Sequence, residues 1–183
     1  MLRAFFRQHR VRYRLHKYPT RKAAEALAHL SGDKTVPPER LAEVFAKDIA
    51  GEQKAISQEV AAGFVVVCDR YLHSTLAYQG VGAGYEKLKG ALSKYSVATP
   101  ELVLLMDIDA AAAAKRKSGQ KELDRHERDV AFLSEVRENY LRMGREGFLS
   151  YKYAVLDAGK PKEEVFTHVL AQVEPLVVRK MEK

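Results

Sequence analysis

The chain has 183 residues, enough for one domain with a sizeable core, and no apolar run approaches the roughly 18–20 residues that span a bilayer. Its net charge of +7 favours anionic partners such as nucleotides or nucleic acid, without choosing between them. The single cysteine, Cys68, excludes an internal disulfide and fits a reducing cytoplasm.

The first segments are basic. Residues 2–9 are expected to form the last turns of a helix with one apolar face. Residues 11–18 alternate apolar and basic side chains, which is a strand pattern, and Pro19 ends it. Acidic residues are missing from positions 1–24. The composition favours a solvated basic face over a surface for phosphate or nucleic acid.

Two helices are expected next. Residues 21–30 are helical, and a longer helix begins at Pro37, because proline suits a first helical turn. Gly63 is expected to close the longer helix. Its apolar positions form one stripe: Leu41, Val44, Phe45, Ile49, Ile56 and Val60.

A short valine-rich run at residues 64–67 predicts a buried strand that meets Asp69 and Arg70. In open α/β sheets the ligand site lies off the carboxyl ends of the strands. An arginine there suits a phosphate, and the carboxylate suits Mg²⁺ or a sugar hydroxyl; an ordinary ion pair is the alternative. Three glycines then predict a flexible loop: Gly80, Gly82 and Gly84.

The second half repeats the rhythm. Residues 101–109 predict a buried strand that ends in carboxylates, and a helix follows at about 129–144. Residues 153–158 predict one more strand, and Lys160 and Pro161 open the final helix. Strands that alternate with helices predict an α/β fold with a parallel sheet wrapped on both faces, in a single domain.

The segment DRYLHSTLAYQG, from Asp69 to Gly80, strongly resembles the signature of thymidylate kinases. Weaker matches agree in order and spacing: Tyr18–Arg21, Val44–Asp48, Pro100–Leu104, Met106–Asp109, Leu123–Glu127, Val136–Tyr140 and Asp157–Pro161. The resemblance covers essentially the whole chain, as one domain over residues 1–183 with a lid at about 115–130. It implies a fold of the P-loop NTPase type (nucleoside-monophosphate kinase group), with strand order 2-3-1-4-5.

The implied reaction is phosphorylation of dTMP to dTDP by ATP with Mg²⁺. Arg21 and Arg70 would bind the dTMP phosphate, Phe45 would stack on thymine, and Thr75 would hydrogen-bond the base edge. For Phe45, packing in the apolar stripe of its helix is the alternative.

The remaining implied roles lie around the sugar, the metal and the donor. Tyr78 would pack against the deoxyribose, with ordinary packing as the alternative, and Gln79 would support the pocket rim. Asp69 would lie near Mg²⁺ and the reacting phosphates. The lid residues Arg116, Lys117 and Arg125 would neutralise the transferring phosphoryl group, unless they form a solvated helix face. The loop from Ala158 to Lys160 would border the donor adenine.

The sequence departs from the family pattern at two places. Ile49 occupies the position of an arginine that contacts the base, so looser base discrimination is expected. The phosphate-binding motif G-x-x-x-x-G-K-[ST] does not occur in the printed sequence.

In the family, the first strand and the phosphate-binding loop precede the helix that residues 2–9 resemble, so the first strand is expected to be missing together with the motif. Three explanations are open. The chain is a truncated reading that keeps the acceptor half of the site, or a rearranged nucleotide-binding protein without catalysis, or another chain supplies the missing strand. A basic nucleic-acid-binding protein is the alternative from another class, although the kinase resemblance makes nucleic acid the less expected partner. The resemblance also suggests a homodimer.

Overall fold

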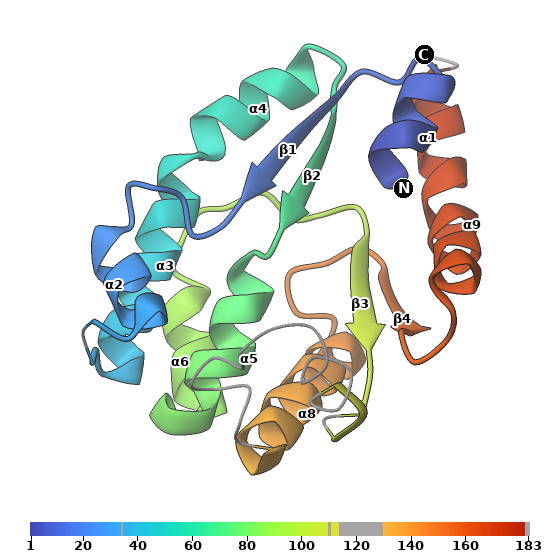
Figure 1. The fold of residues 1–183 in the computed structure, drawn as a ribbon. Helices are drawn as coiled ribbons and strands as arrows, with labels where there is room; N and C mark the ends of the chain where they lie inside the picture. The colour runs from blue at the N-terminus through green and yellow to red at the C-terminus, as the bar shows by residue number, and fades with distance from the viewer. Residues whose placement is uncertain (34, 110, 114–129, 182–183) are drawn as a thin grey trace.

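The computed structural model describes residues 1–33, 35–109, 111–113 and 130–181 (Figure 1). In chain order its elements are α1 (Leu2–Gln8), β1 (Tyr13–Lys17), α2 (Ala24–Ser31), α3 (Pro38–Gly51), α4 (Gln53–Ala61), β2 (Val65–Asp69), α5 (Leu72–Ala83), α6 (Tyr85–Leu92), β3 (Val103–Asp107), α8 (Val130–Glu146), β4 (Tyr153–Asp157) and α9 (Lys162–Met181). The four predicted strands and the alternation of strands with helices are confirmed. Within these ranges, no helix combines the length and apolar character that crossing a bilayer requires.

The strands form two parallel pairs instead of the one sheet that the alternation predicted. β1 pairs with β2 from Tyr13 opposite Val65 to Lys17 opposite Asp69, and β3 pairs with β4 in the same manner. Figure 1 shows β2 and β3 as the inner strands of the two pairs. Among the described residues no ladder joins these two strands, and the family resemblance placed a further strand between them.

The prediction that the strands at residues 64–67 and 101–109 are buried is wrong. All four residues from Val65 to Cys68 in β2, and Val103 to Leu105 in β3, are only partly buried. Met106 is 43% exposed. The physical reason is that the side chains of a strand are buried by the elements that cover its two faces and by the side chains of the strands on either side of it. Within the described ranges, each of these strands has one neighbour.

A shared apolar layer covers one face of both pairs. The buried side chains of this layer come from α1, β4 and α9: Phe5, Phe6, Leu156, Val169, Val173 and Val177. Val65 of β2 and Leu104 of β3 both pack against it. The helix predicted at residues 2–9 therefore belongs to the core that holds the two strand pairs together.

The predicted single helix from Pro37 to Gly63 is two helices. α3 ends at Gly51 and α4 begins at Gln53, because the Glu52 amide donates to the Ile49 carbonyl three residues back, a tighter turn than an α-helix makes. The predicted apolar stripe does not extend to Val60, because this residue is 49% exposed. Gly63 has a φ of +83°, which suits its predicted place after the helix.

The predicted glycine loop is also wrong. Gly80 and Gly82 lie inside α5, and Gly84 alone of the three has a positive φ, of +84°. A Cβ on Gly82 would lie 2.7 Å from Pro38 Cγ, which is too close for real carbon atoms. Glycine at position 82 therefore lets α5 and α3 approach closely, and Gly84 makes the turn into α6.

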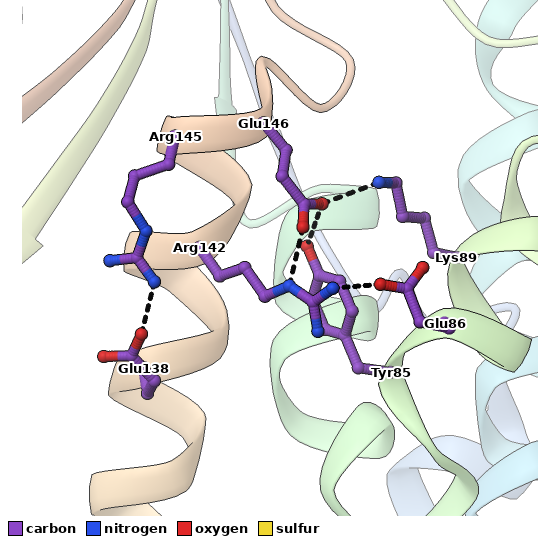
Figure 2. Close-up of polar contacts among 7 residues, drawn as sticks. All are labelled: Tyr85, Glu86, Lys89, Glu138, Arg142, Arg145 and Glu146. Carbon is purple, nitrogen blue, oxygen red and sulfur yellow. Dashed lines mark hydrogen bonds and ion pairs between the residues drawn. The ribbon is translucent and has the colours of Figure 1, made fainter.

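A polar cluster joins α6 to the end of α8 (Figure 2). Glu146 accepts hydrogen bonds from Lys89 Nζ at 2.6 Å, from Arg142 Nε at 2.6 Å and from the Tyr85 hydroxyl at 3.0 Å. The Lys89 hydrogen bond, supported by Arg142 and Tyr85, lowers the pKa of Glu146 to about 2. The carboxylate therefore connects two helices that are distant in sequence.

Candidate functional site

A cavity of about 590 Å³ opens at the carboxyl ends of the strands. One wall comes from α3 and from the start of α5, and the other from the end of β3 and from α8. This is the edge at which α/β proteins bind ligands. The sequence predicted a ligand site here because Asp69 and Arg70 follow a strand.

Arg70 lies at the cavity immediately after β2. Its backbone adopts a φ of +69°, a left-handed conformation that costs a non-glycine residue about 1–2 kcal/mol. Its guanidinium lies 5.4 Å from the centroid of the Tyr78 ring. Backbone strain of this kind is concentrated at functional sites, so the observation supports a functional Arg70.

Helix α5 carries three more of the predicted residues to the same cavity: Thr75, Tyr78 and Gln79. Hydrogen bonds to α8 fix this helix. The Tyr140 hydroxyl donates to Ser74 Oγ at 2.8 Å, and the Asn139 side chain donates to the Ala77 carbonyl at 3.0 Å. The predicted residues on α5 are therefore held by a helix that comes much later in the sequence.

The first turn of α5 is anchored by His73, which is 5% exposed. Its Nε2 donates to the Phe148 carbonyl at 3.0 Å. Burial lowers the pKa of His73 to about 4, so the ring is neutral at pH 7. A buried neutral ring with a satisfied hydrogen bond is a structural support and not a general base.

The α3 wall is apolar. Leu41, Phe45 and Ile49 are spaced four residues apart, which places them on one helix face, and all three line the cavity. Phe45 is partly buried, whereas Ile49 is only 1% exposed. The ring predicted to stack on thymine is therefore at the cavity, and the position of the expected arginine is part of the cavity floor.

An ion pair that the sequence did not single out lies on the opposite wall. Arg137 of α8 donates from Nε to Asp107 Oδ1 at 2.6 Å and from Nη2 to Oδ2 at 2.8 Å. The Arg137 hydrogen bond lowers the pKa of Asp107, which ends β3. The sequence signal for Asp107 was its place at a strand end, but nothing local connects it to a partner thirty positions away.

Other predicted residues lie away from the cavity lining. Arg21 is exposed, although the neighbouring Thr20 is fixed by its amide donating to Asp48 Oδ2 at 2.7 Å. Asp69 is 62% exposed at its side chain and pairs with Lys17 at 3.4 Å. Within the described part of the chain, neither Arg21 nor Asp69 lines this cavity.

The residues predicted for the donor side are not brought to the cavity. Lys160 pairs with Glu164 at 2.5 Å, and the Ala158 amide donates to the Asp107 carbonyl at 2.7 Å. The lid residues Arg116, Lys117 and Arg125 lie outside the described residues.

Asp69 is the residue predicted to lie near Mg²⁺. The described residues contain no group of three or more His, Cys, Asp or Glu side chains that could hold a metal ion. Mg²⁺ in phosphoryl-transfer sites commonly needs only one or two carboxylates, because substrate phosphates and water complete its shell. Asp69, exposed at a strand end, fits that smaller role.

The comparison with known proteins agrees with this geometry. The family model for thymidylate kinase matches residues 5–169. The chain belongs to the thymidylate kinase family. This membership implies the P-loop NTPase fold, with which the parallel strands and flanking helices agree.

Several similar proteins carry the name thymidylate kinase. A probable thymidylate kinase of Pyrobaculum calidifontis is 37% identical over 143 residues, which are 76% of this chain and 70% of that protein. One from Caldivirga maquilingensis is 34% identical over 147 residues, 79% and 69% of the two chains. A thymidylate kinase of Carboxydothermus hydrogenoformans is 36% identical over 119 residues, 62% and 56% of the two chains.

Proposed function

We propose that the cavity binds dTMP as the acceptor in phosphoryl transfer from ATP. The observation that carries the proposal is that Phe45, Arg70, Thr75 and Tyr78 line one cavity at the strand ends of a chain from this family. A nucleotide presents a phosphate, a sugar and an aromatic base, and the cavity offers a guanidinium, a phenol and an aromatic ring for them.

Each group has a physical role. The planar guanidinium of Arg70 would bind the phosphate through charge-assisted hydrogen bonds, and the Phe45 ring would stack on the base. Tyr78 would pack against the deoxyribose and disfavour a 2′-hydroxyl, with Gln79 supporting the rim. Arg21, two residues after the cavity-lining Pro19, would be a second phosphate ligand.

The donor side of the proposal comes from the family alone. An oxygen of the dTMP phosphate would attack the γ-phosphorus in line, and the bond from that phosphorus to the bridging oxygen would break to release ADP. Asp69 would hold Mg²⁺, which supplies positive charge to the phosphates. Arg116 and Arg125 would neutralise the transferring group, with Ala158 and Lys160 beside the adenine.

Ligand-dependent thermal unfolding tests the acceptor proposal. A ligand that binds only the folded state stabilises it, by about 2.7 kcal/mol at one hundred times its Kd. We expect dTMP to raise the Tm of the chain. Thymidine should raise it less, because it lacks the phosphate that Arg70 would bind. Phe45→Leu should reduce the dTMP shift, because an aliphatic side chain cannot stack on the base.

Single-stranded DNA is the control for the basic nucleic-acid-binding alternative, which the comparisons do not favour. Arg12 and Arg14 of the basic strand region already stack on Phe64, at 4.2 and 4.0 Å from its centroid. A Tm shift with an oligonucleotide and none with dTMP would refute the acceptor proposal.

A further inference from the structure

The cavity wall from α3 offers no hydrogen bond to a base. Its side chains are Leu41, Phe45 and Ile49, and the last of these is 1% exposed in the floor. An apolar wall cannot hydrogen-bond to the 4-oxygen or to the 4-amino group of a pyrimidine, so it does not distinguish the two. It favours an apolar substituent, such as a methyl group, on the base.

The polar groups on the α5 side of the cavity can act either as hydrogen-bond donors or as acceptors. Thr75 of α5 lines the cavity and is 3% exposed. A hydroxyl is one donor and also an acceptor, and the Gln79 amide likewise offers both. Each can therefore pair with a ring nitrogen that carries a hydrogen or with one that does not.

The charged groups of the cavity have other partners. The guanidinium of Arg137 is held in a bidentate pair by Asp107, and that of Arg70 lies over Tyr78 beside the exposed end of β2. His29 of α2 also lines the cavity, and its Nδ1 accepts the Val36 amide at 3.2 Å.

We propose that the acceptor site does not distinguish a 4-oxo from a 4-amino pyrimidine, so that it binds 5-methyl-dCMP about as well as dTMP. Thymine presents a donor at N3 and an acceptor at position 4, and 5-methylcytosine presents the reverse. A site with a fixed donor or acceptor rejects the wrong base strongly, because a buried polar group is left unpaired. Thr75 and Gln79 can pair with either edge.

This inference rests on the proposed function, and calorimetric titration separates the two. The chain is titrated with dTMP and with 5-methyl-dCMP at pH 7.5, where both bases are neutral. We expect the two Kd values to agree within about threefold, less than the tenfold that 1.4 kcal/mol represents. If dTMP binds and 5-methyl-dCMP binds about a hundredfold more weakly, the inference is wrong and the proposed function stands. If neither binds, both are wrong.

A variant of Thr75 tests the residue itself. Thr75→Val keeps the branched shape and removes the hydroxyl, so both affinities should fall by a similar factor, on the order of tenfold for one hydrogen bond. Thr167→Val on α9 is the matched control and should change neither affinity. Loss of dTMP affinity alone would show that Thr75 acts with a fixed polarity, which contradicts the inference. Circular dichroism of each variant checks that it is folded.

Discussion

Arg70 combines a strained backbone with a side chain at the cavity. Its φ of +69° is one that glycine adopts without cost, so a sequence selected only for stability would place glycine there. The guanidinium near Tyr78 gives a reason for arginine. At the scale of the residue, the conformational cost of Arg70 therefore opposes the phosphate binding that we propose for its side chain.

Two substitutions of Arg70 separate these effects. We expect Arg70→Gly to have a larger free energy of unfolding than Arg70→Ala, by about 1 kcal/mol, because alanine keeps the left-handed strain and glycine removes it. Both variants should bind dTMP about tenfold or more weakly, since both lose a charge-assisted contact to the phosphate. Urea denaturation and calorimetry measure the two quantities. Equal stabilities would show that the strain is absent.

At the scale of elements, contacts distant in sequence hold the helices that form the site. Tyr140 and Asn139 connect α8 to α5, and the Glu146 cluster connects α8 to α6. The contacts of Tyr140 and Asn139 are part-buried, and the side chains of Lys89 and Glu146 are 31% and 25% exposed. The orientation of α5 at the cavity therefore depends on α8.

The Glu146 cluster makes the free energy of unfolding depend on pH in the acidic range. The pKa of Glu146 is lowered to about 2 in the folded chain from an ordinary value of 4.5. A lowered pKa means that its stabilisation is present above about pH 4.5 and is lost as the pH falls toward 2. We expect the free energy of unfolding to fall less steeply over this range in Glu146→Gln than in the unmodified chain. Chemical denaturation at several pH values measures it.

Glu138 provides the matched control. Its partner is Arg145 on the same helix, and their side chains are 62% and 60% exposed (Figure 2). Exposed pairs contribute little, so Glu138→Gln should follow the pH profile of the unmodified chain. The cluster has no special role if Glu146→Gln and Glu138→Gln have the same profile.

At the scale of the whole molecule, two strand pairs share one apolar layer but no ladder. The inner edges of β2 and β3 are unpaired in the described part of the chain, and their side chains are only partly buried. The layer made by α1 and α9 packs against both pairs, so it keeps them together without backbone hydrogen bonds between them.

Amide hydrogen exchange tests the open edge. The Val65 amide donates to the Arg12 carbonyl at 2.8 Å, and ladder bonds of a parallel strand alternate, so the Val67 amide points to β1 while those of Val66 and Cys68 point away. We expect Val66 and Cys68 to exchange more than about tenfold faster than Val67 by NMR. Equal protection would show that backbone groups cover the second edge.

Sequence patterns predicted local features well. β1, β3 and β4 lie within their predicted runs, and Gly63 follows the helix that it was predicted to close, with a positive φ. Predictions that depended on distant neighbours were wrong: the burial of residues 64–67 and the loop at Gly80 and Gly82. Burial depends on what lies beside a strand, and the role of Gly82 depends on the approach of Pro38.

By itself, the sequence determined the family, the strands and the candidate segment from Asp69 to Gly80, because these depend on residue type and on short spacings. Only the tertiary structure decided which candidates share a cavity: Phe45, Arg70, Thr75, Tyr78 and Gln79 line it, and Arg21 and Asp69 lie outside the lining. It also paired Asp107 with Arg137. These contacts join elements far apart in the chain, and packing between helices and strands sets them where no local pattern can.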